Sequence, residues 1–241
     1  MKKTFLISAV TAVLCIFLLS SCVVANRMTF TGSAAGKNHV DLSVDDFFVG
    51  VLEDLSDWED KGNNDPILDV AVNDFVKKLN ESQTTSGVRF LEAGPNTYMG
   101  DFSFADFSTL VFDLSNGLAD QSILTMSSAG GRTHVEININ MDNYGQLTKI
   151  IPFLADPNFE VYGPLYNHDL SEAEYLEMVS FILGEQCPSS IAKSSIRLQV
   201  ATPSDITGHN GTLKNAKQVE FSFPLIDFLL LHKPIQFWLE Y

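Results

Sequence analysis

The sequence predicts a single α+β domain in which an antiparallel β-sheet packs against several amphipathic helices. Runs of alternating apolar and polar residues, which are typical of strands, occur in several places along the chain. Helix-capping patterns followed by apolar residues at helical spacing lie between them. No internal repeat or linker divides the 241 residues, of which 45% are hydrophobic and 19% charged. The chain is therefore expected to form one core.

The first elements are predicted to be two strands and two helices. Met28–Phe30 and a segment carrying Val40, Leu42 and Val44 flank a turn, which is typical of paired strands. Ser43 and Asp46 form a capping box ahead of a helix, whose apolar stripe comprises Phe47, Phe48, Val51, Leu52, Leu55 and Trp58. Asp65-Pro66 begins a second amphipathic helix, because aspartate caps helices and proline suits their first position.

The middle of the chain is predicted to contain two strand pairs and further helices. Val88–Glu92 and Tyr98–Phe104 are joined by the turn Gly94-Pro95-Asn96, and Ala105–Leu114 follows as a helix. Ile123–Ser127 and Thr133–Met141 form a hairpin, and Leu147–Leu154 a helix disturbed by Pro152. Gly163–Asp169 is expected to be a loop. Ser171 and Glu174 form a capping box for another helix, and the remaining third is interpreted as strand and turn.

The N-terminus has the features of a lipoprotein signal peptide. Lys2 and Lys3 precede the apolar run Phe5–Leu19, which is shorter than the roughly 20 residues that a membrane-spanning helix needs. The run ends in Leu19-Ser20-Ser21-Cys22, which resembles the lipobox of bacterial lipoproteins. The alternative is an ordinary signal peptide that happens to contain a cysteine. Because two small residues and the cysteine directly follow the apolar run, we favour the lipoprotein interpretation and predict that Cys22 carries acyl chains such as palmitate.

This interpretation divides the chain into a signal peptide (residues 1–21), an acylated cysteine with a short tether (22–27) and one domain (28–241). Cleavage removes two lysines and leaves 13 basic residues against 30 acidic ones, a net charge of −17. That charge argues against nucleic-acid binding as the function, because phosphate binding needs positive charge. Attachment to a membrane is expected through the acyl chains.

Two segments resemble the LppM-like lipoprotein domain family. Tyr98–Leu110, with the sequence YMGDFSFADFSTL, is similar to a Tyr-x-Gly strand that leads into a Phe-rich corner. The C-terminal segment, with a Pro203 turn, an Asn210-Gly211 turn and the strand Val219-Glu220-Phe221, is similar to the family's ending. The resemblance covers about two-thirds of the chain. It implies a membrane-anchored α+β domain with lipid or lipoglycan binding and supplies no catalytic residues.

The 18 phenylalanines are the main compositional feature, and they allow two interpretations. Ordinary core packing explains any single phenylalanine. A pocket lined with aromatic side chains and few polar groups would suit an acyl chain. Phe102, Phe104 and Phe107, which lie in the segment that resembles the lipoprotein family, are the candidate ligand-binding residues.

Other chemistry has little support in the sequence. Residues 41–74 contain eleven acidic residues and one basic one, but the loop that starts at Asp57 fails as an EF-hand, because Lys61 occupies a ligand position and Leu68 replaces the bidentate glutamate. A solvated helix face explains these acids better. The histidines and Cys187 match no metal-binding or nucleophile motif. We expect no enzyme activity, no cofactor and no metal site.

Two functions remain, and both place the protein in the cell envelope. The first is an anchored lipoprotein that binds a lipid or another hydrophobic ligand. The second is a non-enzymatic interaction or assembly lipoprotein that docks an envelope partner through its acidic helices. Val23 after the cysteine is not the aspartate that retains many lipoproteins at the inner membrane, so either the cell membrane or an outer membrane is expected.

Overall fold

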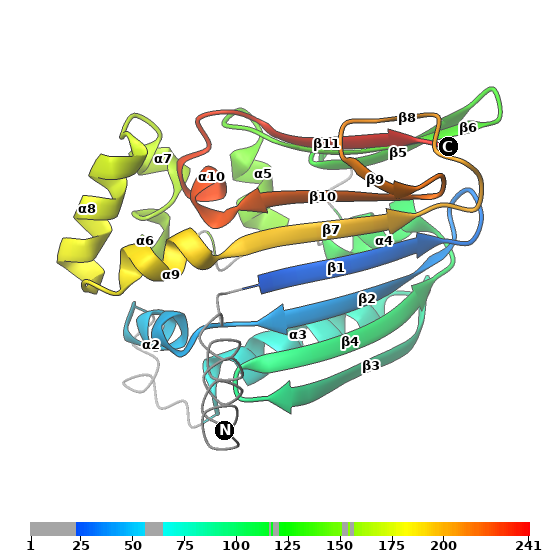
Figure 1. Ribbon diagram of the computed structural model, residues 1–241. Helices are drawn as coiled ribbons and strands as arrows, with labels where there is room; N and C mark the ends of the chain where they lie inside the picture. The colour runs from blue at the N-terminus through cyan, green and yellow to red at the C-terminus, as the bar shows by residue number, and fades with distance from the viewer. Residues whose placement is uncertain (1–22, 56–64, 116, 118–120, 151–153, 155–156) are drawn as a thin grey trace, which may run out of the picture.

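The computed structural model describes residues 23–55, 65–115, 117, 121–150, 154 and 157–241, and it contains two β-sheets with helices behind and beside them (Figure 1). The fold class is confirmed as α+β in one domain. Most helices other than α3 and α4 gather toward one end of the sheets, and the C-terminus lies at the other end (Figure 1). We call the end that is formed by α2 and α6–α10 the helical end.

The larger sheet has seven strands in the order β3-β4-β2-β1-β7-β10-β9. β1 pairs with β2 in the antiparallel sense and with β7 in the parallel sense, so the sheet is mixed. Its strands are β1 (Val23–Phe30), β2 (Gly36–Ser43), β3 (Thr85–Gly94), β4 (Thr97–Phe104), β7 (Ser195–Ala201), β9 (Thr212–Asn215) and β10 (Gln218–Pro224).

The smaller sheet has four strands in the order β5-β6-β11-β8. They are β5 (Leu124–Ala129), β6 (Arg132–Ile139), β8 (Gly208–His209) and β11 (Ile235–Glu240). The C-terminal strand β11 lies between β6 and β8, so it is an inner strand. The hairpin turn between β5 and β6 uses Gly130 and Gly131, both at positive φ, as the glycine pair in the sequence predicts.

The main core lies between the inner face of the larger sheet, the smaller sheet and two helices. Side chains alternate along β4, where Tyr98, Phe102 and Phe104 are buried and Asp101 between them is exposed. Helix α3 (Ile67–Glu81) covers one half of this face, where Phe75 makes ring contacts with the β-strand phenylalanines. Strands β6 and β11 cover the other half and, with α4 (Phe107–Leu114), complete the core.

The helical end consists mainly of short helices. They are α2 (Asp46–Leu55), α6 (Pro157–Glu160), α7 (Pro164–Asn167), α8 (Glu172–Leu183), α9 (Cys187–Lys193) and α10 (Leu225–Leu230), with α5 (Tyr144–Ile150) nearby. The predicted capping box at α8 is confirmed: the Ser171 hydroxyl accepts from the Glu174 backbone N–H, and the Glu174 carboxylate accepts from the Ser171 backbone N–H. At α2 the cap differs, because Asp45 rather than Ser43 accepts from the Phe47 backbone N–H, at 2.9 Å.

Three sequence predictions need correction. Residues 23–27, expected as a tether, belong to β1, because pairing with strands on both sides satisfies their backbone groups. The C-terminal third contains the helices α9 and α10 besides strands and turns. The loop expected at Gly163–Asp169 contains the one-turn helix α7. Three residues named in the sequence predictions, Cys22, Trp58 and Pro152, lie outside the described residues. Within the described residues, no helix is long and apolar enough to cross a membrane.

Candidate functional site

An apolar cavity of about 300 Å³ lies at the helical end. Such a volume is at the lower limit of small-molecule sites, which span about 300–1,000 Å³. Segments that are far apart in the sequence line this cavity: Val44, Phe48, Val51, Leu52, Leu55, Tyr144, Leu154, Phe159, Tyr162, Gly163, Tyr175, Val179, Leu183, Cys187, Ile191, Leu225, Phe228 and Leu229. No residue with a charged side chain is among them.

Helical spacing explains how each helix presents its side chains to this cavity. On α2, Phe48 is followed three, four and seven positions later by Val51, Leu52 and Leu55, so these side chains lie on one face of the helix. The same rule aligns Tyr175, Val179 and Leu183 on α8, and Cys187 and Ile191 on α9. The sequence predicted that the α2 stripe faces a core, but none of the α2 residues is fully buried. The stripe therefore lines the cavity and also packs on buried residues at its edges, with Phe48 against the cluster from α8, α9 and α10 and Leu52 against the cluster around Tyr98.

Neighbouring segments hold α2 in this position. The Asn158 side chain of α6 donates a 2.6 Å hydrogen bond to the Leu55 carbonyl oxygen at the end of α2. Phe47 and Phe48 pack against a cluster of buried residues from α8, α9 and α10. The Tyr175 hydroxyl in that cluster donates to the Tyr162 carbonyl oxygen at 2.8 Å. The cavity walls are thus held by packing and by hydrogen bonds between the segments that line them.

The ionisable side chains that line the cavity are neutral at pH 7. Burial raises the pKa of Tyr175, of Tyr162 and of Tyr144, where Glu160 adds to the effect. Burial also raises the pKa of the Cys187 thiol to about 11. Each of these groups loses hydration on burial, which disfavours its charged form. The cavity therefore suits hydrocarbon and does not suit a charged ligand.

The phenylalanines proposed from the sequence lie elsewhere. Phe102, Phe104 and Phe107 belong to the main core, with exposures of 5%, 3% and 2%, and they do not line the cavity at the helical end. The Phe107 ring lies 5.5 Å from the Phe30 ring and 5.8 Å from the Phe104 ring. Their role in ligand binding stays a prediction. Cys22, the proposed acylation site, lies outside the described residues.

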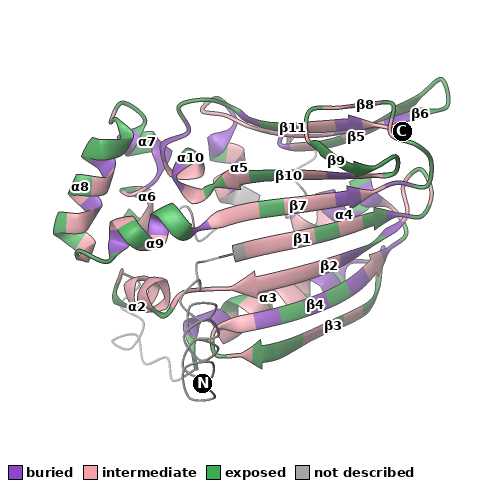
Figure 2. Cartoon of the chain, in the orientation of Figure 1, coloured by how far each residue is buried: buried purple, intermediate pink, exposed green. Residues whose placement is uncertain are grey.

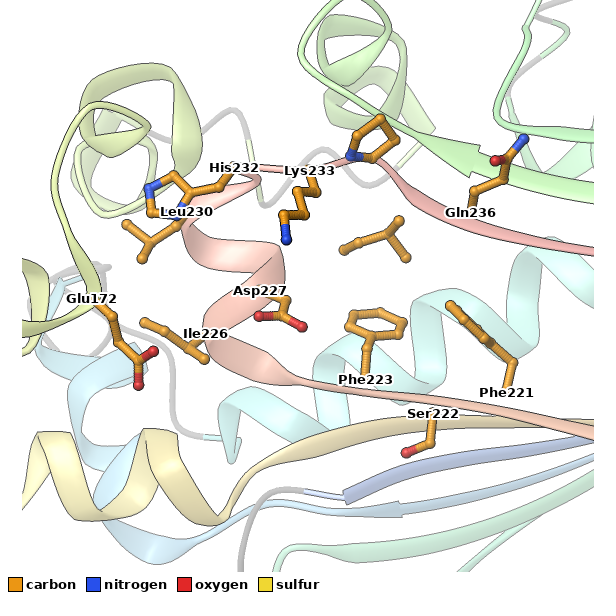
Figure 3. Close-up of a pocket in the computed structure, with 12 residues that line it drawn as sticks. Glu172, Phe221, Ser222, Phe223, Ile226, Asp227, Leu230, His232, Lys233 and Gln236 are labelled. Atoms are coloured by element: carbon orange, nitrogen blue, oxygen red, sulfur yellow. The ribbon is translucent and has the colours of Figure 1, made fainter. Parts of the chain in front are cut away.

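A second, larger cavity of about 470 Å³ lies on the other side of α10 (Figure 3). Ile226, Asp227 and Leu230 of α10 line this cavity, whereas Leu225, Phe228 and Leu229 line the apolar one. Figure 3 shows Lys233 pointing toward the Asp227 carboxylate, with Phe223 beside them. Helix α10 therefore separates an apolar cavity from one with charged walls.

The outer face of the larger sheet carries a polar network around His39. The His39 ring nitrogens lie 2.8 Å from an Asp101 carboxylate oxygen and 2.9 Å from an Asp41 oxygen, and Arg27 donates to Asp41 at 2.7 Å. The hydrogen bond with Asp101 contributes most to raising the His39 pKa, burial opposes it, and Asp41 raises it further. Within the described ranges, no group of three or more His, Cys, Asp or Glu side chains could hold a metal ion.

The fold and the cavity thus define a single α+β domain with an apolar cavity at one end. No family model and no curated protein matches the sequence. The structure is similar to the NMR structure of the folded domain of the Mycobacterium tuberculosis LppM protein, with a TM-score of 0.44 and 11% identity over 92% of this chain and 89% of that one. Neither lipid binding nor anchoring follows from a likeness at this level.

The sequence did not reveal the residues that line the cavity. They are ordinary apolar side chains from seven separate segments, and no local motif distinguishes them from core residues. One signal was present: the α2 stripe, with two adjacent phenylalanines followed by Val51, Leu52 and Leu55, is more apolar than a ten-residue surface helix requires.

Proposed function

We propose that this chain is an exported lipoprotein, anchored through acyl chains on Cys22, whose domain binds the hydrocarbon part of a lipid in the cavity at the helical end. The observation that carries the proposal is the nearly apolar lining of that cavity, which includes no charged side chain among the described residues. Binding needs no catalytic group, cofactor or metal, and we propose no enzyme activity. The lipobox at Leu19–Cys22 supports the anchor independently of the cavity.

The energy of leaving the cavity empty supports a ligand. Residual cavities destabilise a protein by about 24 cal/mol per Å³, so a closed, empty cavity of 300 Å³ would cost about 7 kcal/mol. The net stability of a protein is only about 5–15 kcal/mol. The cavity is partly open, which makes this figure an upper limit. Hydrocarbon would restore much of the lost contact, and water would not, because the walls offer it few partners.

Photolabelling of the full-length protein in its membrane tests the proposal. Cells or membranes receive a fatty acid with a diazirine in its chain, and mass spectrometry locates the labelled peptides after illumination. We expect labels in the peptides of α2, α8, α9 and α10. Leu229→Trp, which adds bulk to the cavity wall, should reduce labelling several-fold, whereas Leu91→Trp adds the same ring at a site that is 72% exposed and should not.

Other results would contradict the proposal in different ways. Labels confined to residues 102–107 would favour Phe102, Phe104 and Phe107 as the ligand residues. Equal labelling of the wild type and Leu229→Trp would exclude the cavity as the site. Absence of any label above the exposed-surface background would favour the docking of an envelope partner instead of lipid binding.

A further inference from the structure

Exposed hydrophobic side chains are concentrated at the helical end. Nine large hydrophobic residues of the described chain are exposed, and five of them lie between residues 161 and 182: Val161, Leu165, Tyr166, Phe181 and Ile182. Phe181 on α8 is the extreme case, with 91% of its surface exposed. Single exposed hydrophobic residues are normal on protein surfaces, but here Leu165 and Tyr166 are adjacent on α7, Phe181 and Ile182 are adjacent on α8, and both helices belong to the helical end.

The predicted anchor is attached at this same end. Cys22 directly precedes Val23, the first residue of β1, and consecutive Cα atoms are only about 3.8 Å apart. Val23 pairs with Ser43 and Ser195. Ser43 leads into α2, and Ser195 follows α9, so the beginning of β1 adjoins the helical end (Figure 1).

A short connection limits how the domain can orient itself. The structure leaves no tether between Cys22 and the sheet, because residues 23–27 are paired within β1. Acyl chains on Cys22 would therefore hold the helical end at the bilayer, with the C-terminal end of β11 pointing away (Figure 1). Figure 2 shows that much of α8 is exposed, so its apolar residues are available for contact.

The charges on α8 exclude electrostatic attraction between this helix and an anionic membrane. Helix α8 carries Glu172, Glu174 and Glu177 and has no basic residue. Acidic side chains are repelled by anionic headgroups, so electrostatic attraction cannot hold this surface to a membrane. Aromatic and aliphatic side chains can enter the interface of a bilayer without any charge on the lipid.

We propose that the helical end lies on the lipid bilayer, with Phe181 and Ile182 of α8 and Tyr166 of α7 inserted into its interface. The proposal rests on the acylation of Cys22 in the proposed function and goes beyond it. It assigns one surface of the domain to the membrane. It also brings the apolar cavity, whose walls include α8, next to the source of its ligand.

The test uses the full-length acylated protein in phosphatidylcholine liposomes. Phe181→Cys and Leu91→Cys are each labelled with the environment-sensitive dye NBD; both original side chains are well exposed, at 91% and 72%. Native Cys187 is buried and its pKa is raised, so the wild type measures the small background of its labelling. We expect blue-shifted emission at position 181, quenched by lipids that carry a nitroxide, and water-like, unquenched emission at position 91.

The remaining outcomes distinguish this proposal from the proposed function. If the protein floats with the liposomes but position 181 emits as in water, acylation holds and the docking surface is wrong. Blue-shifted emission that nitroxide lipids do not quench would indicate a protein contact and would also overturn the proposal. If the protein does not float, the anchor itself fails, and the orientation derived from it fails too.

Discussion

Replacement of Phe107 by alanine tests whether this side chain packs in the core or lines a ligand cavity. The Phe107 side chain is 2% exposed and makes ring contacts with Phe30 and Phe104. Truncation of a buried phenylalanine to alanine costs about 3–5 kcal/mol, and two aromatic contacts favour the upper part of that range. In a domain of this size each kcal/mol lowers Tm by about 2–4 °C, so a loss of about 4–5 kcal/mol in Phe107→Ala should lower Tm by roughly 8–20 °C.

Thermal unfolding followed by far-UV circular dichroism measures this effect, with Phe112→Ala as the matched control. Phe112 lies on the same helix but is 45% exposed, so its truncation should change stability by less than about 1 kcal/mol. Diazirine labelling per folded molecule should be unchanged in Phe107→Ala. A Tm within about 3 °C of the wild type, together with lost labelling, would refute this reasoning and support Phe107 as a ligand residue.

Three further predictions concern the anchor, the C-terminal strand and the polar network. Cys22→Ala should abolish acylation and leave an unprocessed precursor; unchanged incorporation of labelled fatty acid would contradict the lipoprotein assignment. Phe237→Ala should cost about 3–5 kcal/mol in denaturant unfolding, because Phe237 is fully buried and stacks on Phe221; a loss below about 1 kcal/mol would show that β11 is peripheral. Because the His39 pKa is raised, the folded state binds the imidazole proton more tightly than the unfolded state does. Protonated His39 therefore adds to the free energy of unfolding; this addition is complete below about pH 6.5 and is lost as the pH rises through the pKa of the folded state. The stability difference between the wild type and His39→Gln should therefore be larger at about pH 5.5 than at about pH 8.5, and an equal difference would exclude the proton linkage.

The sequence predicted the fold class because its signals are local. Alternation in Val135, Ile137 and Ile139 indicated which face of β6 is buried, and the glycine pair before β6 indicated the hairpin. The capping box at Ser171 located α8 correctly. The parallel pairing of β1 with β7 could not be read in this way, since it joins residues about 170 positions apart and leaves no local pattern.

The candidate site could not be predicted for a related reason. Apolar side chains look the same in a sequence whether they fill a core or surround a cavity, and only the packing of distant segments decides between these outcomes. Phe104 packs in the main core, whereas Phe48, equally apolar, faces the cavity. Helices α9 and α10, with seven and six residues, are too short to show a helical period, so their contributions to the cavity wall were missed as well.

The proposed contact of α7 and α8 with the membrane is weak by itself and depends on the acyl anchor at Cys22. Burial of a large apolar side chain contributes about 1.5–3 kcal/mol, so the insertion of Phe181, Ile182 and Tyr166, after the cost of ordering, corresponds to an affinity near 1 mM. Attachment through Cys22 supplies an effective concentration of the same order, at which the contact is occupied about half of the time or more. The acidic α8 can therefore lie at a membrane although its free affinity is weak.

The unacylated protein should behave differently. At about 10 µM of accessible lipid, roughly 1% of a Cys22→Ala protein that lacks the signal peptide (residues 1–21) should sediment with phosphatidylcholine vesicles, and Phe181→Ala should make no measurable difference to that fraction. In the acylated protein, by contrast, the anchor keeps α8 near the bilayer, so that its weak contact with the membrane is occupied. Phe181→Ala should weaken this contact and increase hydrogen exchange at the α8 amides. Strong vesicle binding by the Cys22→Ala protein would show that the surface binds a membrane without its anchor, and the short connection at Val23 would then not be needed to explain the orientation.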